Sequence, residues 1–108
     1  MRELTLYETI FLLAIAREAG NAYGVTIRAV VARISGRTIP YGTLYSYLDQ
    51  LFRKGYVTKA LGGSASERGG RSKILYRITP DGIAALREAS RIQKAVGLGL
   101  ERFLKAEA

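Results

Sequence analysis

The stretch from Thr38 to Gly55, TIPYGTLYSYLDQLFRKG, constrains the fold most, because it predicts a helix with one apolar face. The apolar residues recur at i, i+4, i+7 and i+8, a spacing that gathers them on the side turned to a core. They are Leu44, Leu48, Leu51 and Phe52. The other side of the helix is free for a partner, with tyrosines at its borders. It holds Tyr41, Gly42, Thr43, Tyr45, Ser46, Tyr47, Asp49, Gln50 and Arg53.

This free side carries short hydrogen-bonding groups and phenols with a single acid, Asp49, a composition that suits the floor of a DNA groove. An ordinary amphipathic helix that turns its polar face to water has the same pattern. The residues on either side of the stretch are needed to separate these two interpretations.

Two helices are predicted before this stretch. Thr5-Leu6-Tyr7-Glu8 has the form of a capping box, so a first helix should run from about Leu6 to Glu18 and end at Gly20-Asn21. Its periodic apolar residues are Leu6, Ile10, Phe11, Leu13 and Ala14. Val25–Ile34 repeats apolar residues at steps of three and four, which favours a second helix, although its β-branched residues also suit a strand. With a turn at 35–39, the three helices form a helix-turn-helix unit.

A β-hairpin with a basic tip is predicted after the third helix. Tyr56–Leu61 and Lys73–Thr79 are rich in strand-forming residues, and the Gly- and Ser-rich segment Gly62–Ser72 connects them. Such a connection alone would suit a disordered solvent loop. Arg68 and Arg71 lie beside glycines that let the backbone approach phosphates, so we expect a polyanion contact here.

A long helix should follow the hairpin, because Thr79-Pro80-Asp81 combines an N-cap residue, a proline in the first turn and an acid near the helix start. The segment Pro80–Lys105 carries an apolar stripe longer than a small domain can cover, and exposed patches of this sort mark partner surfaces. The uncovered residues are Ile92, Val96, Leu100, Phe103 and Leu104. We predict that this stripe forms a homodimer, with folding back onto the first helix as the alternative. Gly97 and Gly99 imply a close helix approach or a bend.

The distribution of charge narrows the choice of partner. The chain has 17 Lys and Arg, nine Asp and Glu, and a net charge of +8. From Arg33 to Arg77 there are nine bases and only two acids, Asp49 and Glu67, as expected for a face that binds a polyanion. DNA is the expected polyanion, and an anionic membrane surface is the competing one.

The residue types that most enzymes and metal sites require are missing. Cysteine and histidine are absent, and the nine acids include no D-x-D or E-x-x-E pair. We therefore predict no enzyme activity, no catalytic residues, no metal site and no cofactor. The longest apolar run, Ile10–Ala16, is far shorter than the roughly 20 residues that span a bilayer, and no signal-peptide pattern is present. A cytoplasmic location without membrane association is expected.

These elements and four local motifs resemble the PadR family of winged-helix transcriptional regulators from about Leu4 to Ala89. The motifs are Asn21–Val25 (NAYGV), Gly42–Tyr45 (GTLY), Leu51–Val57 (LFRKGYV), and Gly69–Arg71 (GGR) followed by Tyr76–Gly82 (YRITPDG). The resemblance implies that Tyr45 is the recognition-helix tyrosine that touches the DNA backbone and that the wing arginines follow phosphates. It also implies the smaller of the family's two size classes, which dimerises through its last and first helices.

The sequence departs from the family pattern at three points. Ser46 stands where the family often has proline, and Leu75 precedes Tyr76 where the family often has paired aromatics. Some short members stack planar drugs between tryptophans at the dimer interface, and this chain has no tryptophan. That ligand mode cannot be transferred, so the identity of any small-molecule effector is open.

We therefore predict a mostly α fold with a small β-hairpin. Residues 1–79 form a winged helix-turn-helix DNA-binding domain, and residues 80–108 form a C-terminal dimerisation helix in the same compact unit. The predicted function is a sequence-specific, homodimeric repressor that binds double-stranded DNA at an inverted-repeat operator. The predicted DNA-binding residues are Tyr41, Gly42, Thr43, Tyr45, Ser46, Gln50, Arg53, Arg68, Arg71 and Lys73. A winged-helix protein-interaction module and a nonspecific architectural DNA binder are the alternatives.

Overall fold

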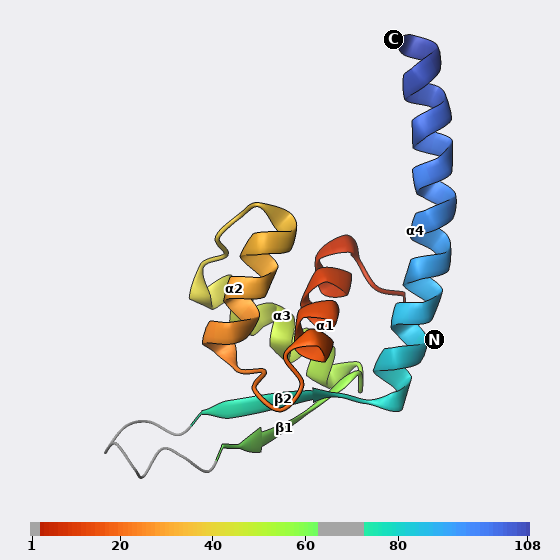
Figure 1. Cartoon of the computed structure of the whole chain (residues 1–108). Helices are drawn as coiled ribbons and strands as arrows, with labels where there is room; N and C mark the ends of the chain where they lie inside the picture. The colour runs from red at the N-terminus through yellow and green to blue at the C-terminus, as the bar shows by residue number, and fades with distance from the viewer. Residues whose placement is uncertain (1–2, 63–72) are drawn as a thin grey trace.

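The computed structural model describes residues 3–62 and 73–108, and its elements follow the predicted order (Figure 1). These elements are α1 (Leu6–Arg17), α2 (Gly24–Ser35), α3 (Tyr41–Arg53), β1 (Val57–Leu61), β2 (Ile74–Ile78) and α4 (Pro80–Glu107). The mostly helical fold with one antiparallel hairpin is confirmed, as is the helical assignment of the β-branched α2. None of the helices in the described ranges has the length and apolar character needed to cross a bilayer.

Helix α1 begins at the predicted capping box. The Thr5 amide donates to Glu8 Oε1 at 2.8 Å, and the Glu8 amide donates to Thr5 Oγ1 at 3.2 Å. The predicted core face of α1 is only partly right, because Phe11 and Ala14 are buried but Leu6 and Leu13 are exposed. The buried stripe consists of Glu8, Phe11, Leu12, Ala14 and Ile15. The predicted and the observed sets both have helical spacing, and the acid Glu8 made the observed set harder to recognise as a buried face.

The core is formed by one face of each of the first three helices, together with buried residues of the hairpin and of the start of α4. Fully buried side chains include Leu12 from α1, Ile27 from α2, and the three leucines of α3. Gly36 ends α2 with a φ of 75° and Gly55 follows α3 with a φ of 79°, backbone conformations that favour glycine. The two turns therefore direct α2, α3 and the hairpin around a shared apolar centre.

The hairpin is fixed to the helical unit along β2. Its register pairs Val57 with Ile78 and Leu61 with Ile74. On its other side, the amide of Tyr76 donates to the carbonyl of Ala22 at 2.8 Å, so the segment that enters α2 lies beside the returning strand. This hydrogen bond thus fixes the position of the hairpin relative to the start of α2.

Thr79 joins the hairpin to α4 and is the predicted N-cap. Its hydroxyl accepts from the Gly82 amide at 3.0 Å and donates to the Gly55 carbonyl at 2.7 Å, while its own amide donates to the Tyr56 carbonyl at 3.0 Å. Gly82 packs so closely that an added Cβ would lie 2.8 Å from Ile78 Cγ1 and would clash with the Tyr56 carbonyl. Helix α4 therefore starts from a rigid junction.

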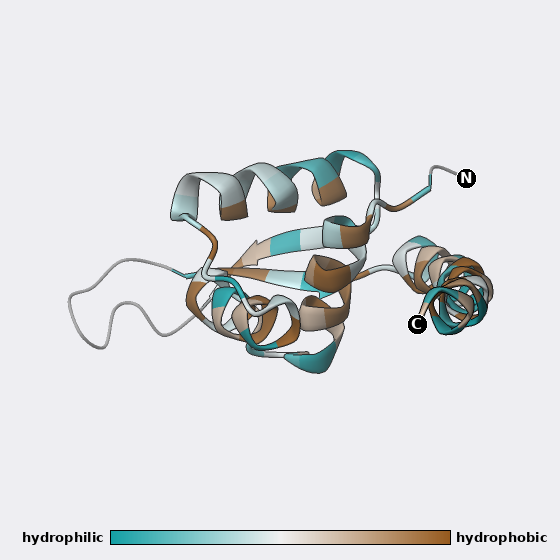
Figure 2. Cartoon of the chain, turned by 90° about the horizontal axis from the view of Figure 1, so that it is seen from above, coloured by the Kyte–Doolittle hydropathy of each residue, from teal (hydrophilic) through white to brown (hydrophobic). Residues whose placement is uncertain are grey.

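The first half of α4 packs on α1, and the second half extends away from the other helices (Figure 1). Ala85 and Ala89 are buried, and Gln93 Nε2 donates to Thr9 Oγ1 at 3.4 Å. Figure 2 shows α4 nearly end-on, standing apart from the helical unit. The molecule measures 59 × 28 × 20 Å along its principal axes, and the long dimension reflects the extended second half of α4. Residues 98–108 are all exposed, so this part of the helix does not fold back onto α1.

Candidate nucleic-acid interface

Helix α3 presents one face to the core and the other to solvent. Leu44, Leu48 and Leu51 are completely buried, as their spacing predicts. Phe52 was predicted on the same face, but its side chain is 42% exposed. It lies about 80° around the helix from Leu44, at the edge of the buried stripe. There its ring contacts the Lys59 ammonium, with Nζ 4.3 Å from the ring centroid.

All seven predicted DNA-binding residues of α3 are on the exposed side of the helix. These residues are Tyr41, Gly42, Thr43, Tyr45, Ser46, Gln50 and Arg53. Tyr41 and Tyr45 are 44% and 47% exposed, so their large rings are available at the N-terminal half of α3. Tyr47, predicted at the border, belongs to the core side instead. Its ring is half-buried and stacks on Phe11 at a centroid distance of 4.8 Å.

The exposed tyrosines are ordered by contacts with α2. The Tyr41 and Tyr45 rings stack with centroids 6.4 Å apart and an interplanar angle of 23°. Arg28 Cζ lies 4.2 Å from the Tyr41 ring centroid, and Arg28 Nε donates to the Ile39 carbonyl at 2.6 Å. The Tyr45 hydroxyl lies against Gly24, where an added Cβ would clash with it. The exposed rings are therefore held in place before any ligand binds.

Two of the cations near α3 are already paired. Arg53 forms an i, i+4 ion pair with Asp49 on the exposed surface. Lys54 turns inward, and its Nζ donates to Glu8 Oε1 at 2.8 Å and to Oε2 at 2.7 Å. Lys54 was counted in the basic central stretch, but this pairing removes its charge from the surface. The charge on the α3 face is therefore smaller than the sequence count indicates.

Glu8 is the buried acid of the described core, with 1% of its surface exposed. Burial opposes ionisation of its carboxyl group, but the hydrogen bonds from Lys54 and the Thr5 amide, together with the Lys54 charge, outweigh that cost and lower its pKa. The carboxylate therefore joins the start of α1 to the end of α3, and it holds α3 at a fixed position beside α1.

The start of α1 lies beside the exposed face of α3. Thr43, Ser46 and Gln50 line one wall of a shallow groove, and residues 5–7 line the other. A partner that contacts the polar side of α3 therefore also meets the first turn of α1. The groove has hydrogen-bonding groups on its α3 wall, which is the arrangement needed to contact polar groups of a nucleic acid.

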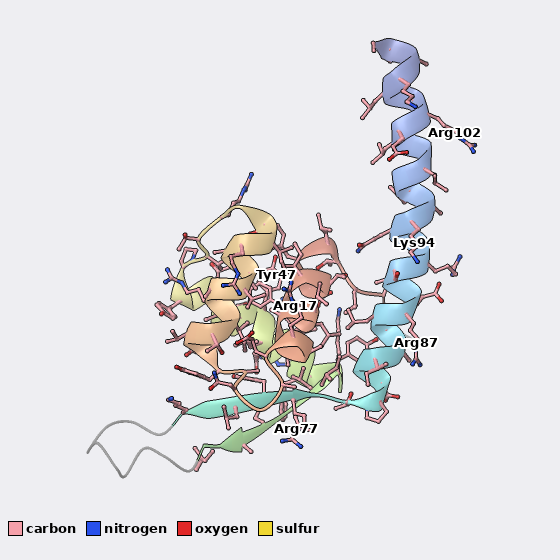
Figure 3. The ribbon with its side chains drawn as sticks, viewed as in Figure 1. Arg17, Tyr47, Arg77, Arg87, Lys94 and Arg102 are labelled. Carbon is pink, nitrogen blue, oxygen red and sulfur yellow. The ribbon has the colours of Figure 1, made fainter. Side chains whose placement is uncertain are left out.

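The base of the wing adds cations and a buried phenol. Lys73 is exposed, and its Nζ lies 4.4 Å from the Tyr23 ring centroid, close to the entry to α2. Burial raises the pKa of Tyr76, with smaller contributions from Tyr45 and Asp49, so this phenol stays neutral. Arg77 extends from the outer side of the hairpin, away from the helices (Figure 3). The predicted contacts Arg68 and Arg71 lie outside the described residues.

Sequence reasoning missed Arg28 and Glu8. Arg28 lies on α2 and contacts Tyr41 on α3, and the sequence has no local signal that pairs these two residues. Glu8 was recognised only as part of the capping box, because an acid within an apolar helix suggests solvent exposure. Its position three and four residues before Phe11 and Leu12 was the available signal for its burial.

Comparisons with known proteins give one consistent result. The family model described as "Transcriptional regulator PadR-like family" matches residues 12–88. No curated protein matches the sequence significantly. A PadR family transcription regulator from Clostridium difficile R20291 is similar in structure, with a TM-score of 0.75, 21% identity, and coverage of 93% of this chain and 99% of that one.

Two further solved structures are similar to this one. A PadR-like transcriptional regulator from Bacillus cereus has a TM-score of 0.75 and 21% identity, covering 90% of this chain and 89% of that chain. A transcriptional regulator from Clostridium thermocellum has a TM-score of 0.73 and 24% identity, with coverage of 90% and 88%. At these identities the likeness establishes a shared fold, which is the predicted winged helix.

Proposed function

Because this chain belongs to the PadR-like family of transcriptional regulators, we propose that it is a homodimeric repressor of an inverted-repeat operator. The family consists of DNA-binding transcription regulators and not of enzymes. The observation that carries the proposal is the exposed side of α3, which lies opposite three completely buried leucines and presents hydrogen-bonding groups and phenols. A helix held in this way can enter a DNA groove without disturbing the core.

In the proposed complex, the N-terminal half of α3 enters the major groove. Tyr41, Thr43, Tyr45 and Ser46 are nearest to bases and backbone, Gly42 allows close approach, and Gln50 and Arg53 lie further along. Lys73, with Arg68 and Arg71, contacts phosphates beside or across the minor groove. Arg53 must exchange Asp49 for a phosphate or a base to take part, because the two side chains are paired in the free protein.

The proposed dimer joins two copies through α4. Ile92 is partly buried, whereas Val96, Leu100, Phe103 and Leu104 are exposed along one side of the helix. Residues 1–79 then act as the DNA-binding domain and residues 80–108 as the dimerisation helix. A two-fold dimer requires an operator with inverted half-sites about one or two helical turns apart.

Repression follows if the bound dimer blocks RNA polymerase at the promoter. A small molecule could release the DNA by changing the angle between the two subunits, and no effector is identified by the described residues. The protein acts in the cytoplasm, where its DNA target is located. These steps are part of the proposal, which membership of the family supports.

Two alternatives predict different DNA binding. A protein-interaction module with this fold would not bind DNA, and an architectural protein would bind all duplexes equally. The exposed bases of the central stretch argue against the first alternative, since a module without DNA has no need for them. The ordered side chains on α3 favour sequence recognition over binding by charge alone.

The test is fluorescence anisotropy of the purified protein on duplex DNA from upstream of its own gene, against scrambled DNA, over a series of salt concentrations. We expect at least ~1,000-fold tighter binding to the upstream DNA and a steep loss of affinity with salt. Equal binding to both duplexes would support the architectural alternative or a distant operator. No binding at low salt would contradict the DNA-binding proposal and favour the interaction module.

A further inference from the structure

Helices α2 and α3 touch through two matched pairs of residues beside the proposed DNA-binding face. Gly24 and Arg28 lie one turn apart on α2, and Tyr41 and Tyr45 lie one turn apart on α3. Arg28 contacts Tyr41, and Gly24 contacts Tyr45. Since each pair is separated by four residues, the contacts fix both the separation and the relative rotation of the two helices.

The Arg28 contact uses two properties of a guanidinium group at once. In its plane, Nε donates to the Ile39 carbonyl at 2.6 Å, in the turn that leads into α3. Its Cζ lies over the Tyr41 ring, 4.2 Å from the ring centroid. A lysine ammonium is a compact point charge, so it cannot place its donor at the Ile39 carbonyl and its charge over the ring centre as well as the extended guanidinium does.

The Gly24 contact depends on the absence of a side chain. Gly24 is buried, and the Tyr45 hydroxyl occupies the space that a Cβ would need. The Tyr41 and Tyr45 rings stack on each other at 6.4 Å, so the two contacts are connected through the tyrosines. An interaction that orients Tyr41 therefore also restricts Tyr45.

From this arrangement we infer that Arg28 is a positioning residue for DNA recognition, one that holds Tyr41, and through it Tyr45, in the orientation presented to the operator. The inference rests on the proposed function, because these tyrosines matter only if α3 binds DNA. Arg28 acts through the two rings and not by its own contact with a phosphate. Its loss should therefore reduce operator recognition more than nonspecific binding.

The experiment compares Arg28→Met with Arg33→Met, an exposed arginine of the same helix that has no hydrogen bond or ion pair within the described ranges. Both variants lose one positive charge, so general electrostatics are matched. Binding is measured by anisotropy over a salt series, on scrambled DNA and on the tightest duplex that the unchanged protein selects from a random-sequence pool. Circular dichroism and thermal melting report the folding of each variant.

We expect Arg28→Met to bind the selected duplex about tenfold more weakly than Arg33→Met. Binding of the two variants to scrambled DNA should agree within about twofold, and the slopes of log K against log salt should be equal. Arg28→Lys should recover only part of the affinity. Combining Arg28→Met with Tyr41→Leu should add little to the loss caused by Tyr41→Leu alone, because both changes break one connected contact.

Three results would overturn the positioning role: equal operator affinity for Arg28→Met and Arg33→Met, additive effects of the Arg28 and Tyr41 changes, or a salt slope lower by about one than that of Arg33→Met. The last result would identify Arg28 as a direct phosphate contact. If Arg28→Met does not fold, Arg28→Lys is compared with Arg33→Lys, so that both variants keep their positive charge, and equal operator affinity for these two would overturn the positioning role. Failure of the unchanged protein to bind any duplex would instead overturn the proposed function, and this inference with it.

Discussion

Single residues set the position of α3, and the pair formed by Glu8 and Lys54 shows how. Both oxygens of the buried carboxylate accept from the Lys54 ammonium, and one of them also accepts from the Thr5 amide. A buried carboxylate with these partners is tolerated, but the same carboxylate without its cation is strongly destabilising. One side-chain pair thus connects the first turn of α1 with the end of α3.

Replacing Lys54 by methionine should lower the free energy of unfolding at pH 7 by about 3 kcal/mol, because Glu8 would be left buried without its cation. Urea denaturation measures this change. Lys59→Met is the matched control, since Lys59 is exposed and its contact with Phe52 should contribute less than about 1 kcal/mol. Equal losses for the two variants would contradict the role assigned to the pair.

The contribution of the pair should also depend on pH. The pKa of Glu8 in the folded protein is below its ordinary value of 4.5, so ionised Glu8 stabilises the fold above that pH. This stabilisation is lost as pH falls through the lowered pKa. The stability difference between the unchanged protein and Lys54→Met should therefore narrow from pH 7 to about pH 3. Urea denaturation at both pH values measures it, and a constant difference would exclude this linkage.

At the scale of whole elements, helix and strand positions could be predicted because their ends carry strong local signals. The capping box at Thr5, the Thr79-Pro80 start and the glycines after α2 and α3 fixed the boundaries to within a few residues. Which face of each helix is buried was harder to predict. Helix α1 has apolar residues on several sides, so only packing against its neighbours α2, α3, β2 and α4 selects the buried stripe. On α3 the polar residues left one choice of buried face, and only Phe52 and Tyr47, at its two edges, were misplaced.

In the candidate site, too, local features could be predicted from the sequence, and contacts between helices could not. The exposed side of α3 could be predicted from periodicity, since it is the complement of the leucine stripe. The contacts of Arg28 with Tyr41 and of Tyr45 with Gly24 could not, because they join separate helices. The sequence also overestimated the positive charge on the exposed face, because Lys54 is paired with Glu8, an acid 46 residues away.

If α3 reads bases and the wing follows phosphates, changes in the two elements should have different effects. Gln50→Ala should weaken operator binding by about 1–3 kcal/mol and relax base preference at one position. Lys73→Ala should weaken binding to operator and scrambled DNA alike, and should reduce the salt slope by about one. Anisotropy over a salt series distinguishes the two patterns. The same pattern for both variants would contradict this division of roles.

The whole molecule has an elongated shape because half of α4 leaves the helical unit. This part of the helix exposes large apolar side chains, and it continues through Gly97 and Gly99, where an added Cβ would meet no other atom within 4 Å. Glycines at these positions are not needed for packing within one chain. A helix of this kind is stabilised when a second copy covers its apolar side.

The proposed dimer can be tested with two leucines of nearly equal exposure on different sides of α4. Leu100 belongs to the apolar stripe and is 54% exposed, whereas Leu98 lies off the stripe and is 57% exposed. Leu100→Glu should convert the dimer to monomer, because it buries a charge in the interface, and Leu98→Glu should remain a dimer. Sedimentation equilibrium measures both masses. The proposal fails if both variants keep, or both lose, the same assembly state.

The junction at Thr79 has a consequence for the operator itself. One residue separates the wing from α4, and its three hydrogen bonds also reach the turn that ends α3. If α4 rotates, α3 and the hairpin should therefore rotate with it as one rigid unit. In a dimer joined through α4, the angle between the two long helices then determines the phasing of the two half-sites along the duplex. Substitutions in α4 should change the preferred spacer length while the half-site sequence stays the same.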